Sequence, residues 1–222
     1  MSIAIAIDGP AGAGKSSLSK EVAKELSFIY VDTGALYRTI GLATSRKGIP
    51  MDDKEGIVSL LDEIQVKLAF NDEGAQIVLL NGEDVSGFIR TPQASMYASA
   101  VSAIPEVRAF LLDLQRDMAK NDNVIMDGRD IGTVVLPDAK IKIFLTASAE
   151  KRAMRRYKEN IEKGIEVSYE EVLKDVNERD YNDSHRAIAP LTPAEDSITV
   201  DTSDYDFEGS KNLLLKVIRE RM

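Results

Sequence analysis

The sequence predicts an α/β fold in which a central parallel sheet is covered by helices, giving three layers. Five short apolar segments alternate with stretches of helical periodicity, which is the pattern of strands joined by crossover helices. Three of these segments end in an aspartate, at Asp8, Asp32 and Asp127. Ligands of such sheets bind at the carboxyl ends of the strands, so we expect the three carboxylates at a binding edge.

The strands of the sheet are expected, in chain order, at residues 2–8, 28–32, 123–127, 140–146 and 197–203. Residues 66–90 interrupt the alternation, because turn signals at Asn71–Gly74 and Asn81-Gly82 divide them into short strands. The second signal is typical of a two-residue hairpin and predicts a small antiparallel insert. Residues 91–120 return to a helical pattern, in which Pro105 marks the start of a new helix because proline is tolerated in the first turn.

The composition describes a soluble globular protein and excludes several classes of function. Of the 222 residues, 44% are apolar and 29% are charged, and the formal net charge is −9. A surface that tracks nucleic-acid phosphates needs an excess of Lys and Arg, so we expect no nucleic-acid partner. The apolar runs are shorter than the roughly 18 residues of a membrane-spanning helix, so we expect no membrane partner. The lack of cysteine excludes thiolate metal sites and suits a reducing cytoplasm.

A glycine-rich motif of the form G-x-x-x-x-G-K-[ST] follows the first expected strand and opens the first expected helix. With the residue after it, the motif comprises Gly9, Pro10, Ala11, Gly12, Ala13, Gly14, Lys15, Ser16 and Ser17. Its glycines let backbone N–H groups surround a triphosphate, and the helix N-terminus adds partial positive charge. Lys15 is expected to reach the β- and γ-phosphates and the Ser16 hydroxyl to ligate Mg²⁺, while Ser17 either contacts the α-phosphate or only caps the helix. The motif therefore predicts a site for ATP with Mg²⁺; the alternative is a turn that only connects strand and helix.

A cluster of arginines follows the fourth expected strand. Arg152, Arg155 and Arg156 are spaced so that one helical face presents all three. Such a face is either a solvated charge run or part of a lid that closes on phosphates.

The next helical segment carries a second charged group. Arg179, Asp183 and Arg186 have spacings that place them on one face of a helix. They form either an intrahelical ladder of ion pairs or the second half of the lid. Closure of a lid would exclude water and so favour phosphoryl transfer over hydrolysis of ATP.

The segment VIMDGRDIGTVV, from Val124 to Val135, runs an apolar strand directly into three charged residues. Either the charges neutralise one another, with Asp130 paired to Arg129, or they bind a ligand. Asp127 either acts on Mg²⁺ through water or holds Arg129. The sequence alone leaves these alternatives open.

Four motifs, taken in this order and context, resemble those of bacterial cytidylate kinases: GPAGAGKSS, VDTGALYR, MDGRDIGTVV and ERDYNDSHRAIAPL. The antiparallel insert is also similar to that family's addition to its monophosphate-binding region. The likeness extends from Ile3 to about Asp201. A P-loop alone is shared by many families, whereas the four motifs together are specific.

The resemblance implies where the two nucleotides bind. The segment from Gly9 to Ser17 would hold ATP. The phosphate of the acceptor would be held by a hydroxyl and three guanidinium groups, those of Thr33, Arg38, Arg129 and Arg186.

The resemblance also implies how the acceptor nucleoside is recognised. Ser99, Arg108 and Asp130 would line a cytosine pocket, and Arg179 with Asp183 would meet the ribose. Cytosine offers an N4–H₂ donor for which a carboxylate is the natural acceptor, whereas uracil presents a carbonyl there. For Ser99 the alternative is a small residue in a tightly packed helix.

The activity that the resemblance implies is ATP- and Mg²⁺-dependent phosphorylation of CMP and dCMP to CDP and dCDP by a cytoplasmic monomer. The residues expected to act in the transfer are all cationic: Lys15, Arg129, Arg152, Arg156 and Arg186. We expect a single unit with a core at about 1–32, 103–150 and 187–222, a monophosphate-binding region at about 33–102 and a lid with its following helix at about 151–186. The alternatives are a kinase of the same architecture that acts on another small acceptor, and a P-loop regulator tied to RNA or a partner protein.

Overall fold

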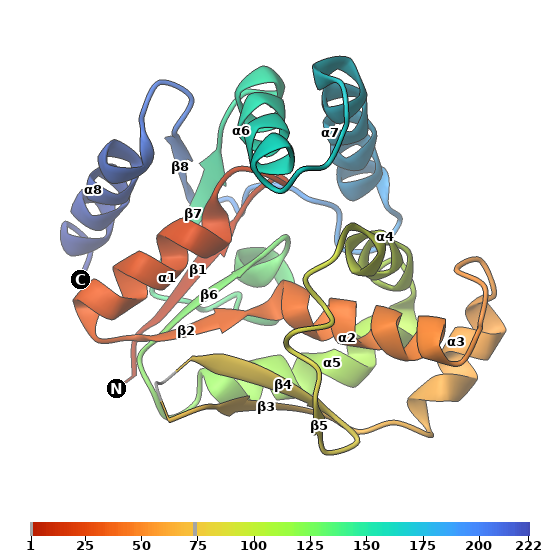
Figure 1. Cartoon of the computed structure of the whole chain (residues 1–222). Helices are drawn as coiled ribbons and strands as arrows, with labels where there is room; N and C mark the ends of the chain where they lie inside the picture. Colours follow the sequence, from red (N-terminus) through yellow and green to blue (C-terminus); the bar gives the residue numbers. More distant parts are fainter. Residues whose placement is uncertain (1, 73–74) are drawn as a thin grey trace. The chain divides into compact units, whose positions relative to one another are not determined.

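The computed structural model describes residues 2–72 and 75–222, and the chain divides into two compact units. The first unit combines both ends of the chain, Met1–Tyr30 and Asn123–Met222, and the second is the continuous stretch Val31–Asp122. Figure 1 follows the chain through the helices and strands of both units. Each unit has its own hydrophobic cluster, so each is described by itself.

A five-stranded sheet has the strand order β2-β6-β1-β7-β8. Its strands are β1 (Ala4–Asp8), β2 (Ile29–Asp32), β6 (Val124–Gly128), β7 (Ile141–Thr146) and β8 (Ile198–Asp201). β1 pairs in parallel with β6 on one side and β7 on the other, and β7 pairs in parallel with β8. The strand that leads into the glycine-rich motif therefore lies in the middle of the sheet, beside the strand that leads into the charged segment. The predicted parallel sheet is confirmed, with each strand beginning and ending within two residues of its expected bounds.

The core of the first unit forms where α1 (Lys15–Leu26) and α8 (Phe207–Arg219) pack on the sheet. Ile5 and Ile7 of β1 are fully buried in one cluster with Leu18 of α1. Burial of each such side chain stabilises the fold by about 1.5–3 kcal/mol. This packing fixes β1 and α1, the two elements that flank the glycine-rich motif.

Two further helices of the first unit follow β7: α6 (Ala149–Glu162) and α7 (Tyr169–His185). Ser148 caps α6, and Ser168 forms a reciprocal capping box at the start of α7, so both helices have defined first turns. A short π-helical turn, η1 (Ile131–Val135), directly follows the charged segment. None of the helices in the described part of the chain is long and apolar enough to cross a membrane.

The described residues of the second unit contain the antiparallel insert and four helices. Its elements are α2 (Thr33–Arg46), α3 (Lys54–Leu61), β3 (Val66–Phe70), β4 (Gln76–Leu80), β5 (Glu83–Asp84), α4 (Pro92–Val101) and α5 (Pro105–Met118). The three strands form an antiparallel sheet of order β3-β4-β5, which confirms the predicted insert. Asn81 and Gly82 both have positive φ, as a two-residue hairpin turn requires. In the other turn signal, Glu73 and Gly74 lie outside the described residues.

One prediction about helical geometry is wrong. α7 ends at His185, and Arg186 has extended backbone angles of φ −64° and ψ 143°. Arg186 therefore does not share a helical face with Arg179 and Asp183. The spacing indicated a longer helix because nothing in the residues before Ala187 signals its end, whereas the following turn draws Arg186 out of the helix by a bond from its Nε to the Ala189 carbonyl.

Candidate active site

The glycine-rich loop has a backbone that requires its glycines. Gly9, Gly12 and Gly14 have φ angles of 148°, 75° and 84°, a region that other residues rarely adopt. A Cβ on Gly9 would also lie 1.9 Å from the carbonyl oxygen of Leu145. The loop then enters α1 at Lys15, so the first N–H groups of the helix face the loop. This geometry forms a cradle for an anion at a helix N-terminus.

Lys15 lies beneath this loop with only 6% of its surface exposed. Its ammonium donates a hydrogen bond of 2.7 Å to the carbonyl oxygen of Pro10. Burial lowers the pKa of Lys15 well below its ordinary value, and the nearby charge of Arg129 lowers it further, whereas Asp127 and Asp8 act in the opposite direction. An anionic ligand beside this amine would favour its charged form.

The carboxylate of Asp127 lies beside the hydroxyl of Ser16. Ser16 Oγ donates to Asp127 Oδ2 over 2.8 Å, and the Tyr30 hydroxyl donates to Oδ1 over 3.0 Å. Asp127 is buried at the end of β6, so both groups meet at the carboxyl edge of the sheet. A hydroxyl and a carboxylate are ligands that suit Mg²⁺, which completes its shell with phosphate and water oxygens.

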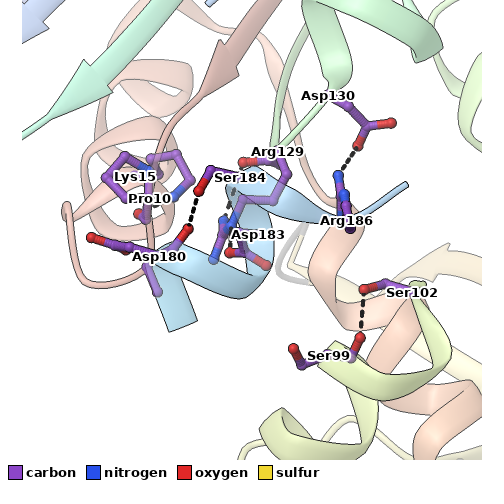
Figure 2. A network of polar contacts seen from close by, with 12 residues as sticks. Pro10, Lys15, Ser99, Ser102, Arg129, Asp130, Asp180, Asp183, Ser184 and Arg186 are labelled. Atoms are coloured by element: carbon purple, nitrogen blue, oxygen red, sulfur yellow. Dashed lines mark hydrogen bonds and ion pairs between the residues drawn. The ribbon is translucent and has the colours of Figure 1, made fainter. Parts of the chain in front are cut away.

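The charged segment pairs with charged residues far along the chain, and Arg129 Nη1 also donates to the adjacent Gly128 carbonyl over 3.2 Å. Arg129 Nε donates to Asp183 Oδ2 over 2.8 Å, and Asp130 Oδ1 lies 3.6 Å from Arg186 Nη2. Figure 2 shows these side chains directed toward one another in pairs. The guanidinium of Arg129 thus pairs with Asp183, and the carboxylate of Asp130 faces Arg186. The oxygens of Asp127 accept from Ser16 and Tyr30, which places this carboxylate beside the hydroxyl expected to ligate the metal ion.

Arginines shape the ionisation of Asp183 at this position. Burial alone would raise the pKa of the Asp183 carboxyl. Arg129 outweighs that effect through its charge and its hydrogen bond, and Arg179 and Arg186 add to it, so the pKa lies below its usual value. The carboxylate is thus held ionised among cations.

Arg152 is buried in the first turn of α6 with 4% of its surface exposed. Its Nη1 donates to the Ala11 carbonyl oxygen in the glycine-rich loop over 2.9 Å, and its Nε donates to Ala147 O over 2.8 Å. The same guanidinium makes a two-pronged ion pair with Asp180 of α7, with Nη1 at 3.0 Å from Oδ1. Arg152 therefore ties the loop, the start of α6 and the middle of α7 together.

Asp180→Ala is expected to destabilise the protein by about 2–3 kcal/mol, because it leaves a buried guanidinium without its carboxylate. The two backbone acceptors of Arg152 remain, and Asp180 is 29% exposed, which keeps the loss below that of a fully buried pair. Urea denaturation of the variant and the parent measures the difference. Glu25→Ala, which breaks the exposed pair with Arg219, is the matched control and should leave the midpoint unchanged; equal effects of the two substitutions would contradict the expectation.

Three further arginines of the first unit, Arg155, Arg156 and Arg179, are partly exposed. Arg155 Nη2 donates to the Thr202 carbonyl over 2.8 Å, whereas Arg156 and Arg179 are half-buried. The three arginines of α6 thus do not form one uniform face, because Arg152 is buried and Arg155 bonds to the loop after β8.

In the second unit, the expected phosphate-binding residues lie at the start of α2. Asp32 caps this helix by accepting from Ala35 N–H over 3.0 Å, and it pairs with Arg38 Nη2 at 2.7 Å. Thr33 is buried at the first helical position. Gly34 provides the space for the pair, since a Cβ there would lie 2.9 Å from Arg38 Nη1.

Two further expected residues of the second unit lie near the junction of α4 and α5. The Ser99 carbonyl accepts from Ser102 Oγ over 3.0 Å. Arg108 is buried, donates to the Ser102 carbonyl over 3.3 Å, and lies 5.7 Å from the centre of the Tyr37 ring. The backbone of Ser99 and the guanidinium of Arg108 are therefore both hydrogen-bonded to Ser102.

Two residues that contact the expected site were not proposed for it: Asp180, which holds Arg152, and Tyr30, which donates to Asp127. Asp8, which was expected at a binding edge, accepts from the backbone of η1. Asp180 and Tyr30 carry no local signal, because their partners lie far away in the sequence.

The fold and this site define a P-loop kinase: a parallel sheet whose central strand leads through a glycine loop to a buried lysine and a hydroxyl–carboxylate pair. The chain belongs to the cytidylate kinase family, whose family model matches residues 5–220.

Cytidylate kinases from other organisms align with this chain over nearly its whole length. The chain is 52% identical over 214 residues to the cytidylate kinase of Carboxydothermus hydrogenoformans, with 96% of each chain covered. It is 54% identical over 208 residues to that of Caldicellulosiruptor saccharolyticus, with 93% of this chain and 91% of the relative covered. Among solved structures, an uncharacterized protein from Eubacterium ventriosum matches 99% of each chain with a TM-score of 0.54 at 14% identity, which is a likeness of fold.

Proposed function

We propose that this protein transfers the γ-phosphoryl group of ATP to CMP and dCMP, giving CDP and dCDP. The observation that carries the proposal is the pairing of a P-loop of this geometry with membership of the cytidylate kinase family over residues 5–220. Relatives that carry the name cytidylate kinase at about half identity support the acceptor.

For the donor, we propose that the loop from Gly9 to Ser17 surrounds the phosphates of ATP and that Lys15 neutralises their charge. Mg²⁺ would be held by Ser16 and Asp127, whose oxygens lie 2.8 Å apart. When bound, the ion would supply positive charge that offsets the charge developing during transfer. Arg152 would act here by fixing the Ala11 carbonyl of the loop.

For the acceptor, we propose that cationic groups hold the monophosphate and that Asp130 reads the base. In the first unit, the residues are Arg129, Asp130, Arg179, Asp183 and Arg186. In the second unit, they are Thr33, Arg38, Ser99 and Arg108. Arg129 and Arg186 already lie beside carboxylates in fixed geometry, which supports a role in positioning an anion.

The chemistry needs no covalent intermediate with the protein. The acceptor is a phosphate oxygen that is already a nucleophile, so no side chain has to remove a proton from it. The side chains proposed to act are therefore those that position the two phosphates and neutralise charge: Lys15, Arg129, Arg152, Arg156 and Arg186.

We further propose the three-part organisation expected from the sequence, with α6 and α7 as the lid region at about 151–186. A monomer that works in the cytoplasm without nucleic-acid or membrane partners completes the proposal. Analytical ultracentrifugation of the purified protein measures its mass in solution and so tests whether it is a monomer.

A coupled assay of ADP production tests the function. The purified full chain is given Mg·ATP and, in turn, CMP, dCMP, UMP and AMP, and chromatography identifies the diphosphate. CMP and dCMP are expected to react with the largest kcat/KM. Intact ATP binding without formation of CDP would disprove the proposal, and a larger kcat/KM for UMP or AMP would reassign the acceptor.

Asp130→Asn is expected to relax base selection. The carboxylate accepts from the cytosine N4–H₂ group, whereas the amide of asparagine can also donate to the uracil carbonyl. The ratio of kcat/KM for CMP to that for UMP should fall by about 10- to 100-fold, since one good base contact discriminates by about 1–3 kcal/mol. Asp117→Asn, which makes the same change at an exposed position of α5, should leave the ratio unaltered; a parallel fall in both values with a constant ratio would show that Asp130 does not read the base.

A further inference from the structure

The carboxylate of Asp8 links the strand before the P-loop to the segment after β6. Asp8 is the last residue of β1, directly before Gly9, and only 5% of its surface is exposed. Its Oδ1 accepts from Ile131 N–H over 2.8 Å, and its Oδ2 accepts from Gly132 N–H over 2.7 Å. Both carboxylate oxygens are thus committed to the backbone of one turn.

That turn is η1, and it begins directly after Arg129 and Asp130. The first N–H groups of any helical turn lack partners within it and must be satisfied from elsewhere. Asp130 stands at the cap position, yet its side chain makes no cap hydrogen bond. Asp8, from a neighbouring strand, supplies the acceptors that a local cap would normally supply.

The approach of Asp8 to the turn is close and leaves little freedom. A Cβ added at Gly132 would lie 3.4 Å from Asp8 Oδ2 and 3.3 Å from Cδ of Lys142. π-helical turns are rare and occur often at functional sites. Asp8 and the aliphatic chain of Lys142 on β7 therefore both lie close against the turn at Gly132.

Burying the ionised carboxylate of Asp8 costs free energy on folding. Burial raises the pKa of Asp8 to about 6, the nearby charge of Asp130 raises it as well, and the two backbone bonds and Lys15 act in the other direction. A group that is unfavourable to bury and yet points at a single backbone turn is better explained by what it orients than by stability.

We infer that Asp8 is a positioning residue for the acceptor nucleotide: it holds the first turn of η1 and thereby sets the direction of Arg129 and Asp130, a role that rests on the proposed phosphorylation of CMP. Asp8 contacts neither nucleotide in this role. Because Asp8 ends the central strand β1, its two hydrogen bonds fix the turn that follows Arg129 and Asp130, the two side chains proposed to meet the acceptor.

Asp8→Asn tests this role in the full chain, because asparagine keeps the volume but turns an N–H group toward one of the two amides. We expect the KM for CMP to rise about 10-fold or more, as loss of a hydrogen bond to a charged group implies, while the KM for ATP changes less than about 3-fold. Asp206→Asn is the matched control, since Asp206 accepts from Gly209 N–H over 2.7 Å at the start of α8, and it should change neither KM.

Gly132→Ala disturbs the same contact by placing a methyl group against the Asp8 carboxylate, and it is the second test if the Asp8→Asn variant does not fold. It should also raise the KM for CMP selectively. Equal rises for both substrates, or a fall in thermal stability with both KM values unchanged, would overturn the inference. Failure of the parent protein to form CDP would instead disprove the proposed function, so the two failures are distinguishable.

Discussion

Lys15→Met lowers kcat by about 10²- to 10³-fold in our expectation, the loss typical when one charged donor is removed from a developing anion. The ammonium lies under the glycine loop, where burial has already lowered its pKa. Because the fold has to bury this charge, its removal should not reduce the free energy of unfolding. Activity and stability should therefore separate: steady-state kinetics show the loss, and urea denaturation shows an unchanged or higher midpoint.

Lys20→Met is the control for this substitution. Lys20 lies on the same helix but is exposed, so its replacement should leave kcat and stability close to those of the parent. A Lys15→Met variant that is as active as the parent would refute the proposed role of the ammonium. A large loss of stability would show that its bond to the Pro10 carbonyl serves the fold first.

Arg129→Met should weaken every monophosphate alike, with kcat/KM lower by about 10²-fold or more for CMP, dCMP and UMP, since a charge-assisted contact to a shared phosphate is lost. The substitution also removes the partner of Asp183, whose side chain is only 9% exposed. Leaving that carboxylate buried should lower the free energy of unfolding by about 3 kcal/mol. The coupled assay and urea denaturation measure the two effects.

A double-mutant cycle separates the two consequences of losing Arg129. Adding Asp183→Asn removes the uncompensated charge, so stability should recover in the double variant. The capacity to hold the acceptor phosphate should not recover with it. Recovery of activity together with stability would show that Arg129 acts only by holding α7 through Asp183.

The P-loop and the strands could be predicted because their signals are local. Nine consecutive residues determine the loop, whose positive φ angles only glycine adopts readily, and the alternation of apolar segments indicates the parallel sheet. The hairpin at Asn81-Gly82 and the helix beginning at Pro105 are equally local, and both were predicted.

The pairing of charges could not be predicted, because it depends on tertiary structure. Arg129 has acidic neighbours two residues before it and one after it, yet its partner is Asp183, 54 residues later. Adjacent side chains in an extended backbone point in different directions, so nearness in sequence does not determine which charged side chains form an ion pair. The contact of Arg152 with Asp180 and with the Ala11 carbonyl, 141 residues away, has the same origin.

The division of the chain into a continuous unit and a discontinuous one constrains the order in which the protein can assemble during synthesis. Val31–Asp122 leaves the ribosome as one stretch and contains its whole hydrophobic cluster, so its core can form early. β1 is made first but has to wait for β6 and β7, and the bonds from Gly132 to Asp8 close a separation of 124 residues. Until then the apolar strand before the P-loop has two unpaired edges, so it is open to pairing with other chains during synthesis.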